Sequence, residues 1–222
     1  MDPAPPDRRG AGEAGRAVSA PPKTVLEATP EEEAAIRAAV RAPDLAALGL
    51  GRALATPADA PALARLFQDP AVSDPIYDLP RPFTEENVRA WIETAVDERE
   101  RGEGLLLTNL DAAGELVGYS KFTVWPDRSA AELAGAMRAN RQNAGDGSAG
   151  ALRSFGWMFE NLGVRLIGLT AALDNVRSAR LIDAAGFKRM GERDSIRPDG
   201  SVRRSLYWEM TREAWRARLP TG

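Results

Sequence analysis

The sequence predicts one α/β domain built around a mixed β-sheet. Helix and strand signals alternate from Gly51 to the end of the 222-residue chain. A strand–helix–strand order between residues 131 and 171 implies two parallel neighbours. Turn sequences at 111–114 and 198–200 imply antiparallel hairpins. The 44% of apolar and 27% of charged residues are typical of a soluble globular protein with a core of its own.

The first part of the chain is predicted to lie outside this domain. Residues 1–22 are dense in Pro, Gly and Ala and cannot bury enough surface to offset their ordering entropy, so we expect a disordered tail. Residues 23–48 are expected to form a linker with an accessory helix at 30–41, since Pro30 begins a run with three glutamates in its first turn. The domain itself is placed at residues 49–218.

The remaining elements follow from periodicity and from turn or cap residues. Thr84 is a good N-cap for a long helix, and Asp111 to Gly114 has the composition of a tight turn. The apolar run at 164–171 is typical of a strand that is buried on both faces. Strands are expected at 52–56, 105–110, 115–124, 131–139, 164–171, 187–197 and 202–210, and helices at 57–68, 84–101, after 147 and at 175–185.

The composition excludes several function classes. The chain has no cysteine and no histidine, so disulfide scaffolds, thiolate zinc sites, cysteine nucleophiles and Ser-His-Asp triads are impossible, and we expect no metal site. A net charge of −3 gives no electrostatic drive toward nucleic acid. No stretch approaches the roughly 18 apolar residues of a membrane span, and the N-terminus lacks a secretory signal. We therefore expect a cytoplasmic protein that binds neither nucleic acid nor membrane.

A glycine-bearing loop precedes the helix that begins near residue 147. The pattern Gln142-x-x-Gly145-x-Gly147 would bring bare backbone close to a ligand, and N–H groups at a helix start bind phosphate. Arg138 is close enough in sequence to add a charge-assisted contact. The Walker lysine and the Rossmann glycine spacing are missing, and Asp146 would repel a phosphate unless it points outward. An ordinary turn is the alternative.

Two segments together resemble a known family. Residues 142–147, QNAGDG, resemble the Q/R-x-x-G-x-G/A acyl-CoA loop of the GCN5-related N-acetyltransferases (GNAT). Residues 174–192, from DNVRS to AGFKRMGE, are similar to the N-x-x-S…GF…G segment of the RimJ/RimL-like branch of that superfamily. The order of elements from Gly51 to Trp215 is similar as well, so the resemblance covers about three quarters of the chain.

The resemblance implies a fold and a cofactor site. The fold is a mixed central sheet with flanking helices whose middle strands, here 131–139 and 164–171, splay apart to admit the pantetheine arm of acetyl-CoA or another acyl-CoA. Asn175 would hydrogen-bond that arm; it could instead cap its helix, unless Asp174 is the cap. The implied cofactor-binding residues are Met137, Arg138, Gln142, Asn143, Ala144, Gly145, Asp146, Gly147, Ser148, Asn175 and Ser178.

Two residues are candidates for catalysis. Many relatives carry a tyrosine that protonates the departing thiolate, but Ile182 stands at that position, so Ser178 is the candidate near the sulfur; it could instead bond the preceding turn of its helix. Glu132 is the titratable candidate for a general base on the central strand, or else a surface glutamate at a strand start. Five aromatic residues could wall an acceptor pocket or fill the core: Phe83, Trp91, Trp125, Tyr207 and Trp208.

The sequence therefore predicts an acyl-CoA-dependent N-acyltransferase. Its acceptor would be a primary amine, such as an N-terminal α-amine or a small amine, because an α-amine of pKa about 8 is partly neutral at pH 7 whereas a lysine-like amine is not. A homodimer is possible. The alternative is a GNAT-like module that binds acyl-CoA without turnover, which the missing tyrosine, the missing histidine and Asp146 leave open. An unrelated phosphate-binding protein is a third possibility.

Overall fold

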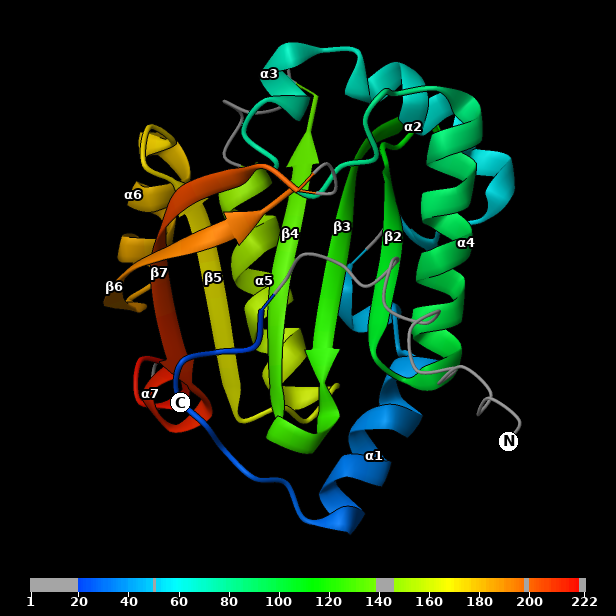
Figure 1. Cartoon of the computed structure of the whole chain (residues 1–222). Coiled ribbons are helices and arrows are strands. Elements are labelled where there is room, and N and C mark those ends of the chain that lie inside the picture. The colour runs from blue at the N-terminus through cyan, green and yellow to red at the C-terminus, as the bar shows by residue number, and fades with distance from the viewer. Residues whose placement is uncertain (1–19, 50, 139–145, 198–199, 220–222) are drawn as a thin grey trace, which may run out of the picture.

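The computed structural model describes residues 20–49, 51–138, 146–197 and 200–219, without the side chains of 146–148. A seven-stranded sheet in the order β1-β2-β3-β4-β5-β7-β6 carries helices on both faces (Figure 1). Its strands are β1 Arg52–Leu54, β2 Gly104–Leu110, β3 Leu116–Trp125, β4 Ala130–Met137, β5 Leu166–Ala172, β6 Lys188–Ile196 and β7 Val202–Thr211. The helices are α1 Pro30–Arg41, α2 Ala60–Phe67, α3 Pro70–Ser73, α4 Glu85–Arg101, α5 Asp146–Glu160, α6 Val176–Ala184 and α7 Arg212–Arg216. The predicted mixed α/β class is confirmed.

The sheet is mixed because of one crossover. Strands β1 to β4 form an antiparallel meander, whereas β4 and β5 are parallel. The chain between β4 and β5 contains α5, and a parallel pair requires a connection of this kind. Beyond β5 the pairing is antiparallel again, through β7 to β6. The predicted parallel pair therefore lies in the middle of the sheet.

Local sequence signals account for the element ends. Thr84 caps α4 by accepting the N–H of Asn87, and Gly102 ends the helix in the left-handed region with φ of 75°. A Cβ on Gly102 would lie 2.7 Å from the backbone of Arg37, so only glycine fits there. In the β2–β3 turn, Asp111 Oδ1 accepts two backbone N–H groups. These two predictions from short motifs are confirmed.

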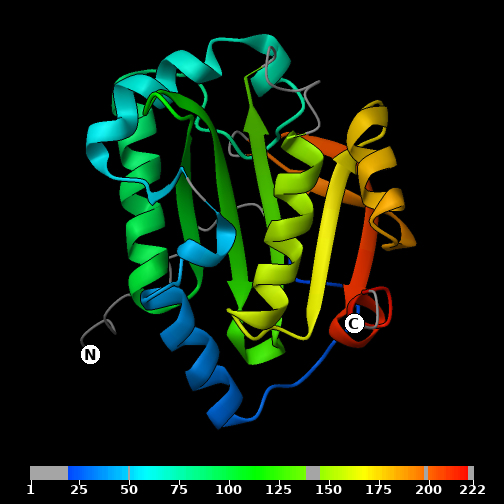
Figure 2. The ribbon, with the colours of Figure 1, turned by 180° about the vertical axis from the view of Figure 1, so that it is seen from behind.

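The two faces of the sheet have separate apolar clusters. Leu105 and Leu107 of β2 belong to the cluster that α1, α5 and α6 cover, while Leu106 between them belongs to the cluster under α2 and α4. This alternation is the normal consequence of strand geometry. We call the side of α1, α5 and α6 the back face, which is nearest the viewer in Figure 2, and the other side the front face.

The N-terminal region packs more closely than expected. The predicted helix at 30–41 is present, but Ile36 and Val40 are 1% and 0% exposed and belong to the back-face cluster. The expectation of an accessory helix outside the main fold therefore differs from the observed packing, because these two residues, at i and i+4, form an apolar stripe that needs cover. Of the predicted tail, residues 1–19 lie outside the described residues. Residues 20–24, which we call the strap, lie against β5, β6 and β7.

Candidate functional site

The two central strands separate soon after they meet. Strands β4 and β5 pair at only three positions, Ala130 with Leu166, Ala131 with Ile167 and Glu132 with Gly168. Beyond this point they diverge, and α5 is visible through the gap between them in Figure 1. The strand edges that face the gap form no further β4–β5 pairs, and such edges can hydrogen-bond an extended ligand. The predicted splay of the middle strands is confirmed.

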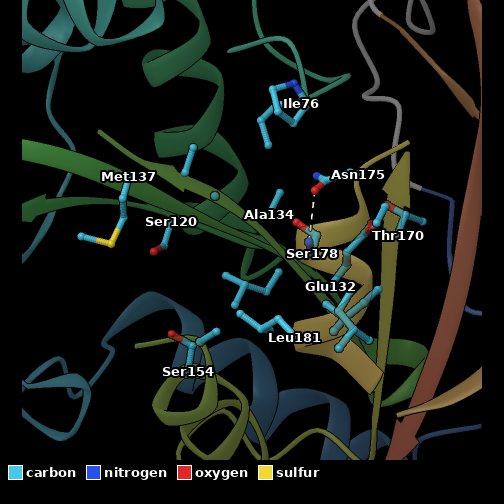
Figure 3. Close-up of a pocket in the computed structure, with 18 of the residues that line it drawn as sticks. Ile76, Ser120, Glu132, Ala134, Met137, Ser154, Thr170, Asn175, Ser178 and Leu181 are labelled. Carbon is cyan, nitrogen blue, oxygen red and sulfur yellow. Dashed lines mark hydrogen bonds between the residues drawn. The ribbon is translucent and has the colours of Figure 1, made fainter. Parts of the chain in front are cut away.

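A cavity of about 220 Å³ fills this gap. Residues 133–137 of β4 and 169–171 of β5 line it, together with Gly150 and Ser154 of α5 and Ser178 and Leu181 of α6. Figure 3 shows Ser120, Met137 and Ser154 on one side of the cavity and Glu132, Thr170, Asn175 and Ser178 on the other. In Figure 2, α5 starts at the end of the sheet where the strands are far apart. The positive end of the α5 dipole therefore lies near the open end of the gap.

Asn175 is the N-cap of α6. Its side-chain Oδ1 accepts the N–H of Ser178 at 3.1 Å, so Asn175 and not Asp174 caps this helix. The cap uses only the oxygen of the amide, and Nδ2 forms no hydrogen bond with the part of the chain that the structure describes. Since Asn175 also lines the cavity, an amide donor remains available there while the helix is capped.

Ser178 and Ile182 lie one turn apart on α6 with different surroundings. Ser178 is half-buried and lines the cavity, and its hydroxyl makes no hydrogen bond to the preceding turn or to any other described residue. Ile182 is 5% exposed; it reaches the cavity wall as well, but its side chain packs in the back-face cluster. The position of the family tyrosine is therefore taken by a core contact, whereas a hydroxyl is present one turn earlier.

Glu132 occupies the last paired position of β4. Its side chain is 7% exposed, lines the cavity and accepts a hydrogen bond from Thr170 Oγ1 at 3.0 Å on Oε1. The alternative of a surface glutamate is therefore wrong. Because side chains alternate along a strand, Glu132 and Thr170 project from the front face, opposite Ala131 and Leu169 of the back-face cluster. Thr170 had no recognisable sequence signal, because only the β4–β5 register places it beside Glu132.

The other predicted cofactor residues divide into three groups. Met137 lines the cavity, while Arg138, the next residue, is exposed and its N–H donates to the Val117 carbonyl at 2.8 Å. Helix α5 begins at Asp146 and includes Gly147 and Ser148, whose side chains are not described. The remaining four lie outside the described residues: Gln142, Asn143, Ala144 and Gly145. The phosphate-binding role of the loop therefore stays a prediction.

The front wall of the cavity comes from residues that the sequence did not single out. They are Pro75 to Asp78 after α3, Tyr119 of β3 and Arg203 of β7. Burial, together with the charge of Asp78, raises the pKa of Tyr119, so its hydroxyl stays protonated. Asp78 is itself buried, 4.0 Å from Lys121 Nζ. The segment after α3 carries no motif, and only its tertiary packing identifies it.

None of the five predicted aromatic residues lines this cavity. Trp208 is fully buried on the back face, and its Nε1 donates to Asp183. Tyr207 projects from the front face, and its hydroxyl donates to Glu209 at 2.7 Å. Both side chains therefore pack and form hydrogen bonds inside the protein, and neither forms a wall of the cavity. The aromatic side chains that do line the cavity are Tyr77, Tyr119 and Phe155.

The described residues contain neither an acidic metal-binding cluster nor a membrane-spanning helix. Within 20–49, 51–138, 146–197 and 200–219, no three acidic side chains gather as a metal site would require. No helix in these ranges is both long and apolar enough to cross a membrane.

Comparisons with known proteins agree with the architecture. A family model described as "Acetyltransferase (GNAT) domain" matches residues 52–188. The ribosomal-protein-S5-alanine acetyltransferase of Vibrio fischeri is 17% identical over 74% of this chain and 93% of that chain, with a TM-score of 0.62. RimJ of Mycobacterium smegmatis, solved with CoA-disulfide, is 18% identical over 73% of this chain and 81% of that chain, with a TM-score of 0.62.

A third similar structure is that of AAC(6')-Ib in complex with ribostamycin and coenzyme A. It is 21% identical over 77% of this chain and 98% of that chain, with a TM-score of 0.64. At such identities these likenesses show the fold alone. No curated protein sequence matches the chain. Because the family model covers more than half of the residues, the chain belongs to the GNAT acetyltransferase family.

Proposed function

We propose that this protein transfers an acetyl or other short acyl group from acyl-CoA to a primary amine. The observation that carries the proposal is the β4–β5 gap, which ends at a buried glutamate and is lined by the helix that bears the family's N-x-x-S motif. Two of the similar structures were solved with coenzyme A or its disulfide, which supports an acyl-CoA donor. The amine acceptor is part of our proposal.

The donor side of the site would be the back face. The pantetheine arm would lie between the free edges of β4 and β5, with Asn175 Nδ2 as a donor to its carbonyl groups. The N–H groups at the start of α5 and in the loop 142–147 would hold the pyrophosphate. Ser178 would stand near the sulfur, where its hydroxyl can donate a hydrogen bond to the departing thiolate.

The acceptor side would be the front face, with Glu132 at its base. The amine nitrogen attacks the thioester carbonyl carbon, the carbon–sulfur bond breaks, and CoA leaves as a thiolate. The amine loses one proton, which Glu132 takes up while Thr170 holds Oε1 of the carboxylate in place. An α-amine or another amine of low pKa suits this site best, since a larger fraction of it is neutral at pH 7.

The direct test measures CoA thiol release from acetyl-CoA with a panel of primary amines. Release above the hydrolysis background with at least one amine supports transfer. If no amine promotes release while acetyl-CoA, but not ATP, still raises the melting temperature, the protein is the non-catalytic acyl-CoA module instead. Ligand at a hundred times its dissociation constant adds about 2.7 kcal/mol of stability, so binding is easy to detect.

Three variants separate the proposed roles. Asn175→Asp keeps a side-chain cap for α6 but removes the amide donor, so KM for acyl-CoA should rise with little loss of stability. Ser178→Ala should lower kcat with little change in donor affinity. Glu132→Gln should lower kcat where the wild-type carboxylate is ionised, and the acidic limb of the wild-type pH profile should vanish in this variant. Arg180→Ala, on the exposed side of α6, is the control and should change none of these values.

A further inference from the structure

Arg203 of β7 is held at the front wall of the cavity. Its guanidinium carbon lies 4.9 Å from the centre of the Tyr77 ring, and its Nη1 donates to the Pro75 carbonyl at 2.6 Å. Both contacts come from the segment after α3, which lines the same cavity as Glu132. The side chain is therefore fixed in position on the side of the sheet that we assign to the acceptor.

Within the described part of the chain, this guanidinium has no direct counter-charge. Among the described residues no carboxylate lies within 4.0 Å of it, and its Nε–H is buried without a hydrogen-bond partner. Burial lowers the pKa of Arg203, although Asp78 and Asp174 favour its charged form from a distance. An arginine guanidinium is so strong a base that the side chain stays a cation despite this lowering of its pKa. A half-buried cation with unused donors is costly, and a bound anion would offset that cost.

The adjacent arginine shows what is unusual about Arg203. Arg204 points to the other side of β7, its side chain is 68% exposed, and its Nε lies 2.7 Å from Glu192. Arg189 on the neighbouring strand likewise pairs with Asp183 at 2.6 Å. Arg193 of β6 resembles Arg203 in being held by backbone carbonyl groups and a tyrosine ring, but it does not line the cavity. Among these four arginines, Arg203 alone both lines the cavity and lacks a carboxylate partner within the described chain.

We propose that Arg203 binds a carboxylate of the acceptor, so that the preferred substrates are primary amines that also carry a carboxylate. This inference rests on the proposed function and assigns its substrate class. The planar guanidinium fork matches a carboxylate, and Glu132, which lines the same cavity, receives the amine. One acceptor molecule thus places its amine at Glu132 and its carboxylate at Arg203.

The test uses pairs of acceptors that differ in one group. Oligoglycines of increasing length, each with a free α-amine and a free C-terminal carboxylate, are compared with the corresponding C-terminal amides, with acetyl-CoA as donor. At the best length, kcat/KM of the wild-type protein should favour the carboxylate at least tenfold. Arg203→Gln should bring this ratio close to one, with kcat/KM for the carboxamide within about twofold of the wild-type value. Arg204→Gln should keep the wild-type ratio.

Calorimetric binding of the same pairs to the CoA-saturated protein separates this inference from the proposed function. If no amine is acylated but carboxylate binding still requires Arg203, transfer fails and the carboxylate site stands. If amines are acylated without preference for the carboxylate, or if Arg203→Gln slows both members of each pair equally, the inference is overturned and Arg203 only holds the segment after α3. If Arg203→Gln does not fold, Arg203→Lys takes its place. This variant keeps the charge and should retain part of the preference for the carboxylate.

Discussion

The front and back faces of the sheet differ sharply where β4 and β5 separate. On the back face the strands present Leu169 and Trp208, which pack among the apolar side chains of α5 and α6. On the front face their neighbours in sequence are Thr170 and Glu209, whose polar groups are hydrogen-bonded. Strand alternation thus separates a core from a polar surface within single elements. The back face should therefore dominate stability, and the front face should determine the chemistry.

The strap is what buries the front face beside the site. Glu209 accepts hydrogen bonds from the backbone N–H of Thr24 at 3.0 Å, from the Thr24 hydroxyl and from the Tyr207 hydroxyl. Pro22 lies over Gly168, the register partner of Glu132: a Cβ on Gly168 would be 3.3 Å from Pro22 and 2.8 Å from the Tyr207 oxygen. Figure 1 shows this N-terminal segment crossing in front of β7 and β5. Over β5 and β7 the front face is therefore closed by hydrogen bonds, unlike the apolar layer under α2 and α4.

The largest effect on stability is expected on the back face. Phe155→Ala should lower the free energy of unfolding by about 3–5 kcal/mol, because the ring is 2% exposed and packs against Phe187 at 4.9 Å and Trp215 at 6.3 Å between ring centres. Urea denaturation monitored by tryptophan fluorescence measures the change. A loss below about 1 kcal/mol would mean that neighbouring side chains move in to fill the space left by the ring, which this close packing does not predict.

A smaller effect is expected from the buried carboxylate on the front face. Glu209→Gln should cost about 1–3 kcal/mol at pH 7, because one acceptor oxygen becomes an amide donor that faces other donors. The same denaturation experiment applies, with Glu213→Gln on exposed α7 as the matched control. An equal loss of unfolding free energy in both variants would show that the contacts between Glu209 and the strap do not stabilise the protein.

The difference in the free energy of unfolding between wild type and Glu209→Gln should change with pH in a definite direction. Burial alone would raise the pKa of Glu209, but the hydrogen bonds from Thr24 and Tyr207 outweigh it and hold the pKa below its usual value. Its contribution to stability is therefore complete above the unfolded pKa of about 4.3 and is lost as the pH falls through the lower folded pKa. The stability gap between wild type and Glu209→Gln should stay constant from pH 7 to 5 and shrink below about pH 4. A gap that widens in acid would contradict this assignment.

The strap itself is tested by Thr24→Val, which keeps the shape of the side chain and removes its hydroxyl. We expect a loss of about 1 kcal/mol, since one hydrogen bond to a charged acceptor disappears while the backbone N–H still bonds Glu209. Combining Thr24→Val with Glu209→Gln should cost less than the sum of the two, because the residues are direct partners. Additive costs would place Thr24 and Glu209 in separate interactions.

The smallest effect is expected for an exposed ion pair between the ends of α5 and α7. Arg216 and Glu160 are 2.8 Å apart, but their side chains are 56% and 47% exposed. Arg216→Ala should change the free energy of unfolding by no more than about 0.5 kcal/mol, because solvent and salt screen such pairs. Thermal melts at low and high salt measure this change in stability. A loss above about 1 kcal/mol would mean that the ion pair, and not only apolar packing, holds α7 against α5.

The sequence predicted what local patterns determine. The Thr84 cap, the Asp111 turn and the parallel β4–β5 pair each follow from residues close together in the chain, and all three are confirmed. The motif on α6 likewise led to Asn175 and Ser178, which both line the cavity.

What the sequence missed depends on distant partners. Lys23 and Thr24 follow a stretch whose composition predicts disorder, yet Thr24 bonds Glu209, which is 185 positions away. Tyr77 and Arg203 meet only because β7 and the segment after α3 come together at one end of the cavity. Local sequence patterns such as hydrophobic periodicity, helix caps and motif spacing carry no information on contacts between residues that are distant in sequence. The acceptor side of the site is therefore harder to predict than the cofactor motif.

Hydrogen exchange with and without acetyl-CoA tests the central claim most directly. If the donor arm occupies the gap, saturating acetyl-CoA should slow exchange in residues 133–137 of β4 and 169–172 of β5, while the strap at 20–24 exchanges as before. An equal concentration of ATP should leave both strands unchanged. Protection that appears only elsewhere in the chain, or equally with ATP, would contradict the account.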